Sequence, residues 1–185
     1  MQIRYLLILV ISLLFFSCAV RKKSTKTNVL SAVSSEKTQP KTQKGQAANN
    51  VLLKNGSVNI NRKEFVNYSE KFLGVPYLYG SAEPAKGFDC SGFLLYVFNH
   101  FNIKAPRTSY SYENVGNEVT INKAQPGDLI LFTANEPEKI GHIGIVTKAG
   151  EAISFIHAST SKGVIISTLS GYYEKHFVKI ISVLK

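Results

Sequence analysis

The feature that most constrains the fold is a change of composition near residue 55. Residues 19–54 are rich in Ser, Thr, Lys, Gln and Asn and hold no aromatic residue. A segment of this kind cannot bury enough apolar surface to offset the entropy that it would lose on ordering. We therefore expect a flexible linker over residues 18–54 and a single folded domain over residues 55–185.

The positive charge of the chain is concentrated in this linker. The formal net charge is +10. Residues 19–54 hold eight Lys or Arg against one acidic residue, Glu36, whereas residues 55–185 hold 13 Lys or Arg against 11 acidic residues. The balanced charge of the expected domain argues against a nucleic-acid partner. The linker either is attracted to anionic lipid or wall polymer, or is simply a solvated tail.

Residues 1–17 are typical of a signal peptide. Arg4 precedes a predominantly apolar run over residues 5–16, and the small residue Ser17 follows. The run is too short for a transmembrane helix, which needs about 20 apolar residues. Residues 15–18 resemble a bacterial lipobox, and this resemblance implies that Cys18 is lipidated and attaches the mature chain to a membrane. The alternative is an ordinary signal peptide followed by an incidental cysteine.

The first part of the expected domain favours two helices. Asn61 can cap a helix over residues 61–73, because Glu64 follows three residues later, as in a capping box. Apolar residues recur at helical spacing, and Gly74 is a suitable end. A second helix is expected to begin around residues 89–91 and to bury an apolar stripe that includes Phe93 and Leu94.

The second part favours strands. Short β-favouring runs occur at residues 128–132, 142–147, 152–157, 164–168 and 177–183. Helices followed by consecutive strands predict an α+β fold, with N-terminal helices packed on a mainly antiparallel β-sheet.

Cys90 stands where the second helix should begin. A cysteine reacts as its thiolate, and the dipole at a helix N-terminus favours negative charge. We therefore expect the pKa of Cys90 to be lowered. Asp89 is expected to cap the same helix, with a direct substrate contact as the alternative.

Two of the four histidines are candidates for a base. His142 and His157 each lie on a strand-like run, and adjacent antiparallel strands would place the two imidazoles side by side. One could then accept the thiol proton while the other fixes its tautomer. Taken alone, each would more often be a structural core residue. His100 and His176 are expected at the surface.

Six short motifs follow one another along the expected domain, and together they are more specific than any one of them alone. They are residues 74–80 (GVPYLYG), 88–93 (FDCSGF), 106–109 (PRTS), 126–129 (PGDL), 141–145 (GHIGI) and 156–158 (IHA). The set resembles the NlpC family of cell-wall cysteine peptidases, over nearly all of residues 60–185. The resemblance implies a reduced papain-like fold.

The resemblance also implies roles for single residues. Cys90 would be the nucleophile, His142 the general base and His157 the residue that orients His142. A contact to the oxyanion is implied for Tyr77, and contacts to the substrate for Ser91 and Arg107. For Asp89 a substrate contact remains the alternative to capping. For Tyr77 simple packing is an equal alternative, and a lone loop arginine such as Arg107 is more often solvated.

The implied function is hydrolysis of peptidoglycan stem peptides, with the bond between the γ-carboxyl of D-glutamate and diaminopimelate as the first expectation. The alternatives are D,D-endopeptidase cleavage of cross-links between diaminopimelate and D-alanine, and a non-catalytic wall-binding lipoprotein. An amidase or acyltransferase using the same residues is a further rival. No cofactor is expected, and no metal, because the sequence lacks Cys/His pairs at zinc-binding spacing. We expect a monomer in the cell envelope, anchored by lipid and facing the periplasm.

Overall fold

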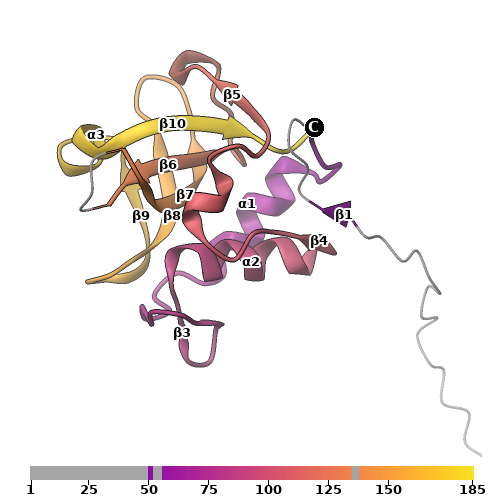
Figure 1. Ribbon diagram of the computed structural model, residues 1–185, viewed down its shortest axis with the longest axis vertical. Helices are drawn as coiled ribbons and strands as arrows, with labels where there is room; N and C mark the ends of the chain where they lie inside the picture. Colours follow the sequence, from indigo (N-terminus) through magenta and orange to yellow (C-terminus); the bar gives the residue numbers. More distant parts are fainter. Residues whose placement is uncertain (1–49, 52–55, 135–137) are drawn as a thin grey trace, which may run out of the picture. The chain divides into compact units, whose positions relative to one another are not determined.

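The computed structural model describes residues 50–51, 56–134 and 138–185 (Figure 1). The expected signal peptide, Cys18 and most of the expected linker lie outside the described residues. Within the range expected to be linker, β1 (Asn50–Val51) pairs in parallel with β4 (Ile103–Lys104), so paired backbone occurs before residue 55.

Helix α1 (Arg62–Glu70) begins as its sequence predicts. The side chain of Asn61 accepts a hydrogen bond from the backbone N–H of Glu64, at 3.1 Å. The helix ends three residues earlier than expected, because the N–H groups of residues 71–73 bond to the carbonyls three positions back and tighten the chain into a turn. Gly74 then takes the left-handed conformation, with φ +85°.

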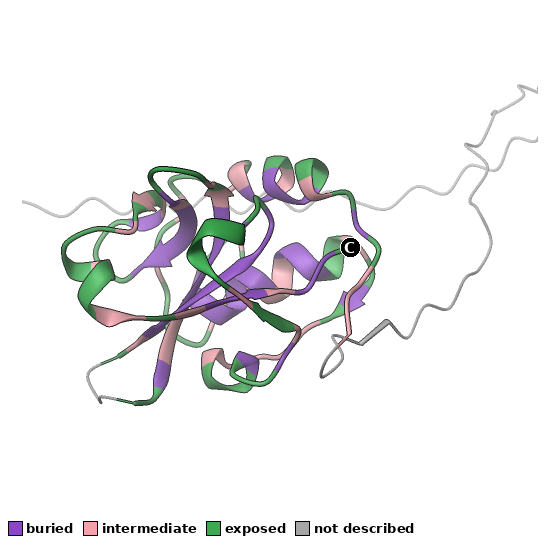
Figure 2. Ribbon diagram, turned by 90° about the horizontal axis from the view of Figure 1, so that it is seen from above, coloured by how far each residue is buried: buried purple, intermediate pink, exposed green. Residues whose placement is uncertain are grey.

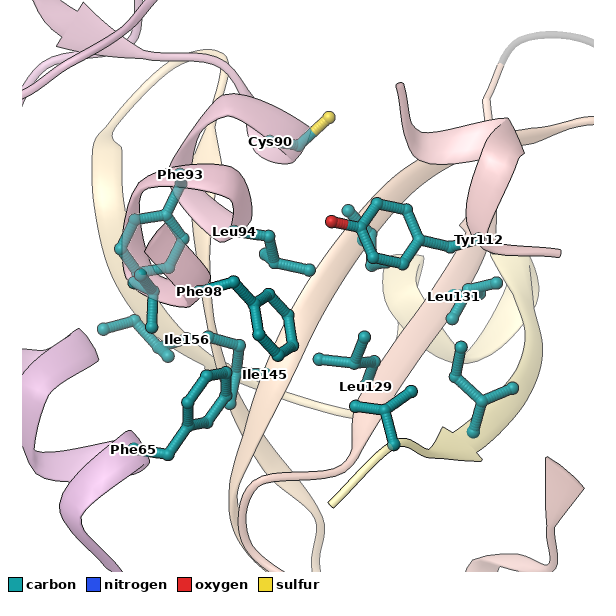
Figure 3. Packing of buried hydrophobic residues seen from close by; sticks show 14 of the residues in the cluster. Phe65, Cys90, Phe93, Leu94, Phe98, Tyr112, Leu129, Leu131, Ile145 and Ile156 are labelled. Carbon is teal, nitrogen blue, oxygen red and sulfur yellow. The ribbon is translucent and has the colours of Figure 1, made fainter. Parts of the chain in front are cut away.

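Helix α2 (Cys90–His100) carries the nucleophile candidate as its first residue. Asp89 caps it by accepting a hydrogen bond from the N–H of Gly92, at 2.6 Å. Figure 3 shows Cys90 at the first turn, with its sulfur pointing away from the packed side chains of Leu94 and Phe98. The cap and the buried stripe of this helix are those that the sequence predicts.

A six-stranded antiparallel sheet forms the second layer, in the order β5-β10-β6-β7-β8-β9 (Figure 1). Its strands are β5 (Asn117–Val119), β6 (Leu129–Thr133), β7 (Ile140–Lys148), β8 (Ser154–Ser159), β9 (Gly163–Thr168) and β10 (Phe177–Ser182). All but β5 correspond to predicted strands. The α+β fold with a mainly antiparallel sheet is confirmed.

Several short elements were not predicted. They are β2 (Ala82–Glu83), β3 (Gly87–Phe88), the 3-10 turns η1 (Ser109–Tyr112) and η2 (Ile121–Lys123), and helix α3 (Tyr172–His176). Strands β2 and β3 pair with each other just before Cys90.

Successive residues of each strand point to opposite faces, so the sheet serves two cores. On one face, alternate residues such as Leu129, Leu131 and Ile145 pack with the apolar sides of α1 and α2. On the other, Phe132 and Phe155 belong to a smaller cluster that Tyr173 of α3 joins. Figure 2 shows the buried residues gathered along the sheet and the helix packed on it.

Arg62 connects α1 to the ends of two strands. Its guanidinium donates to the Asp128 carboxylate at 2.8 Å and to the Ser182 hydroxyl at 2.8 Å. It also donates to the carbonyl oxygens of Pro126 and Leu184, at 3.0 and 2.8 Å. Because Asp128 is only 1% exposed, its ion pair with Arg62 is largely shielded from water.

Candidate active site

Cys90 lies where the start of α2 meets β7. Its thiol donates a long hydrogen bond to the carbonyl oxygen of Gly141, with 3.9 Å between the two atoms. Gly141 directly precedes His142 on β7. Packing of the helix on the sheet therefore brings the nucleophile candidate next to the base candidate, from positions more than fifty residues apart in the sequence.

The two candidate histidines form a direct pair. His142 lies on β7 and His157 on β8, in a register that pairs Ile145 with Ile156. Nε2 of His142 and Nδ1 of His157 are 2.9 Å apart, and the two rings are perpendicular. Since Nε2 of His142 is engaged in this way, Nδ1 is the nitrogen that can accept a proton from a thiol.

Cys90 and both imidazoles open on one pocket of about 330 Å³. The other lining residues are Tyr77, Phe132, Thr133, Ala134, Gly141, Ser159, Thr160, Tyr172 and Tyr173. Within the described part of the chain, the sulfur of Cys90 makes no hydrogen bond to His142. The geometry thus places the candidate nucleophile and the candidate base in one cavity without a direct hydrogen bond between them.

The predicted lowering of the Cys90 pKa is wrong. Burial raises the pKa of this thiol, and the charge of the neighbouring Asp89 carboxylate raises it further. Backbone N–H groups, including those of Ser91 and Ile143, oppose this increase but do not overcome it. The helix N-terminus contributes as expected, yet removing the sulfur from water has the larger effect.

Both histidines are held neutral. Burial lowers the pKa of His142 to about 4. Burial also lowers the pKa of His157 to about 3, and repulsion from a charged His142 adds to this effect. At neutral pH the site therefore contains an uncharged thiol and two uncharged imidazoles.

Asp89, Ser91 and Arg107 form a cluster that supports the start of α2. Arg107 donates to both carboxylate oxygens of Asp89, at 3.0 and 2.7 Å, and to the Ser91 hydroxyl at 3.1 Å. Burial alone would raise the pKa of Asp89, but the hydrogen bonds from Arg107 and from the N–H of Gly92 lower it overall. Substrate contacts were expected for Ser91 and Arg107, and were the alternative to capping for Asp89, but none of the three residues lines the pocket.

Tyr77 does line the pocket. Its backbone forms a β-bridge with Phe88, which holds it beside the loop that leads to Cys90. Burial raises the pKa of Tyr77, and the charges of Cys90 and Asp89 raise it further. This position is compatible with both readings of Tyr77, an oxyanion contact and simple packing.

Sequence reasoning missed two hydroxyl groups behind His157. Nε2 of His157 lies 3.0 Å from the hydroxyl oxygen of Ser167 and 3.2 Å from that of Tyr173. Ser167 lies on β9, and Tyr173 on the unpredicted helix α3. The only available signal was the adjacent pair of tyrosines after Gly171, and this pair has no helical or strand spacing of its own.

The other two histidines lie away from the pocket lining. His100 is exposed, as expected, and stacks on Tyr68 with 3.6 Å between ring centroids. His176 is half-buried, whereas a surface position was expected, because it stacks on Tyr172 and bonds to the Tyr172 carbonyl oxygen.

Comparison with known proteins identifies the family. A family model described as the NlpC/P60 family matches residues 74–182, more than half of the chain. The chain belongs to the NlpC/P60 family. The matched range contains Cys90, His142 and His157, so the pocket lies within the NlpC/P60 domain.

Two curated relatives and one solved structure show the extent of the likeness. The chain is 41% identical over 111 residues to a gamma-DL-glutamyl hydrolase of Bacillus subtilis (strain 168), covering 60% of this chain and 26% of that protein. It is 39% identical over 103 residues to the murein DD-endopeptidase MepS/murein LD-carboxypeptidase of Escherichia coli (strain K12), covering 55% of this chain and 52% of the relative. The match therefore spans about a quarter and about half of these relatives.

The solved structure is an NlpC/P60 family protein from Bacillus cereus ATCC 10987. It superposes with a TM-score of 0.61 at 26% identity, over 71% of this chain and 43% of that one. The NlpC/P60 fold expected from the motifs is thus shown by both sequence and structure.

In the part of the chain that the structure describes, no three His, Cys, Asp or Glu side chains are grouped so that they could hold a metal ion. None of the described helices is long and apolar enough to cross a membrane.

Proposed function

We propose that this chain is a cysteine endopeptidase that hydrolyses peptidoglycan stem peptides through Cys90, His142 and His157. The observation that carries the proposal is the convergence of a thiol and two hydrogen-bonded imidazoles on one pocket of an NlpC/P60 domain. The names of the relatives, a gamma-DL-glutamyl hydrolase and a murein endopeptidase, support the substrate class.

The reaction begins from the neutral pair. As the sulfur of Cys90 attacks the amide carbon, the thiol proton passes to Nδ1 of His142. The carbon–nitrogen bond then breaks, His142 protonates the departing amine, and a thioester remains. Water attacks the thioester with His142 as base, which releases the carboxylate product and restores the thiol. The backbone N–H of Cys90 and the Tyr77 hydroxyl are the proposed donors to the oxyanion.

The bond that we propose is the one between the γ-carboxyl of D-glutamate and diaminopimelate. Support comes from the 41% identity to a gamma-DL-glutamyl hydrolase. The cross-link between diaminopimelate and D-alanine is the second candidate, favoured by the 39% identity to a murein DD-endopeptidase. Because the two bonds give products of different mass, one assay distinguishes them.

The test is cleavage of defined muropeptides, both uncrosslinked and crosslinked, by the full chain and by Cys90→Ala. We expect cleavage by the wild type and none by the variant, with product masses that name the bond. Cys18→Ala is the matched control, since it removes the other cysteine of the chain and should leave cleavage of soluble muropeptides unchanged. If wild type and Cys90→Ala bind muropeptides equally and neither cleaves them, the chain is a wall-binding module instead.

We also propose that the chain is a lipoprotein of the cell envelope, anchored through Cys18. The support is the apolar run of residues 5–16, which ends directly before Ser17 and Cys18.

A further inference from the structure

The side of His157 that faces away from His142 meets two hydroxyl groups. His157 is fully buried, and its Nε2 has both Ser167 and Tyr173 within hydrogen-bond distance, at 3.0 and 3.2 Å. The Tyr173 ring also packs against the His157 ring, with centroids 5.2 Å apart. Burial raises the pKa of Tyr173, and a hydrogen bond between its hydroxyl and that of Ser167 opposes this increase, so the two hydroxyls also interact with each other. His157, Ser167 and Tyr173 thus form a triangle of interacting polar groups.

The direction of the hydrogen bonds in this triangle decides which nitrogen of His142 carries a proton. A neutral imidazole has one N–H donor and one acceptor nitrogen. If Nε2 of His157 donates to the hydroxyls, its Nδ1 must accept from Nε2–H of His142. Nδ1 of His142 is then a free base. If a hydroxyl donates to His157 instead, every bond reverses, and Nδ1 of His142 carries a hydrogen that prevents it from taking the thiol proton.

The arrangement of the hydroxyls favours the productive direction. A serine oxygen has two lone pairs, so Ser167 can accept from Nε2–H of His157 and from the Tyr173 hydroxyl together. Tyr173 then has an acceptor for its proton other than His157. Without Ser167, the remaining neighbour of the phenol within the triangle would be Nε2 of His157, to which it would donate.

We propose that Ser167 and Tyr173 are positioning residues that hold His157 in its Nε2–H tautomer and so keep Nδ1 of His142 free to act as a base. The tautomer is a property of the free protein. Only the effect of the tautomer on cleavage rests on the proposed function. The inference about the tautomer and the proposed function can therefore fail separately.

The test compares Ser167→Ala, Tyr173→Phe and the double variant in the full chain. In Ser167→Ala, Tyr173 becomes a donor to His157, and we expect kcat to fall about 10- to 100-fold with KM little changed. Tyr173→Phe leaves Ser167 as acceptor, so we expect a loss of at most about 5-fold. In the double variant the Tyr173 hydroxyl can no longer donate to His157. We therefore expect its kcat to rise above that of Ser167→Ala and to approach that of Tyr173→Phe.

Nitrogen chemical shifts of ¹⁵N-labelled histidine at pH 7 report the tautomers without any substrate. Wild type, Tyr173→Phe and the hydroxyl-preserving Ser167→Thr should show Nε2–H on both residues, and Ser167→Ala should show Nδ1–H. Tyr110→Phe, an exposed tyrosine away from the pocket, is the matched control. Unchanged tautomers in Ser167→Ala would overturn the inference, and so would a double variant slower than Ser167→Ala. Correct tautomers in a protein that cleaves nothing would refute the proposed function alone.

Discussion

The fold removes Cys90 and His142 partly from bulk water, and this burial shifts the pKa values of both groups. Burial raises the pKa of the thiol and lowers that of the imidazole to about 4, so a charge on either group is disfavoured. Both shifts favour the neutral forms, so we expect the resting pair to be an uncharged thiol and an uncharged imidazole. In the reaction that we propose, proton transfer then accompanies attack on the substrate, whose developing oxyanion offsets the charge on His142.

Alkylation of Cys90 should reveal this neutral state. Iodoacetamide reacts with the thiolate, so its rate follows the ionised fraction of the thiol. We expect slow alkylation near pH 6 and a rise of about tenfold per pH unit until the raised thiol pKa is reached. Stopped reactions analysed by mass spectrometry would give the rate at each pH, with Cys18→Ala used so that Cys90 is the only reactive thiol. A rate that is already constant between about pH 5 and pH 7 would instead indicate a resting ion pair.

Asp89→Asn is the matched variant for the same measurement of the Cys90 alkylation rate against pH. An asparagine oxygen can still accept the hydrogen bond from the N–H of Gly92, so the helix cap remains. The charge beside the sulfur is lost, and the alkylation curve should therefore move to lower pH.

Among the elements, α1 depends on one side chain for its attachment to the strand ends. Arg62 makes four hydrogen bonds to groups before β6 and at the end of β10, and one of these partners, Asp128, is almost fully buried. Removing one member of a buried ion pair leaves the other charge without compensation. The attachment therefore contributes more to stability than an ion pair at the surface does.

Arg62→Ala should lower the free energy of unfolding by about 3 kcal/mol or more. Lys86→Ala is the control, because its ion pair with Glu83 is exposed and should contribute about 0.5 kcal/mol or less. Urea denaturation followed by circular dichroism measures both. Equal effects of the two substitutions would show that the Arg62 cluster is not a stabilising attachment.

The elements also show how far the sequence can predict this molecule. Both helix caps, Asn61 and Asp89, act within three residues, so local pattern was sufficient to find them. The adjacency of His142 and His157 followed from simple antiparallel pairing. The partners of Arg62 lie more than sixty residues away, and the raised Cys90 pKa depends on burial by the whole fold. No local pattern could have revealed either.

For the whole molecule, the proposed nucleophile and the proposed base come from different layers. Cys90 belongs to a helix, and His142 belongs to the sheet on which that helix packs. Their approach depends on the core between the two layers, so the site is complete only when both layers are assembled. The segment before the domain adds a separate function in our proposal, namely attachment to a membrane through Cys18.

Cys18→Ala should release the protein from the membrane. We expect the wild type to sediment with membranes and to incorporate a radiolabelled fatty acid, and the variant to do neither, because no acyl chains anchor it. Cys90→Ala is the control and should keep both the label and the membrane fraction. Retention of the label in Cys18→Ala would contradict lipidation at this residue.

The protonated sulfur of Cys90 also affects how long the protein survives. A thiolate, rather than a neutral thiol, attacks peroxide and disulfides, and the ladder from sulfenic to sulfonic acid begins from that form. A thiol that is 9% exposed and kept neutral offers such reagents little to react with. In our proposal, the same burial that slows the first proton transfer also slows oxidation of the sulfur between turnovers, and we expect it to lengthen the working life of the protein wherever oxidants reach it.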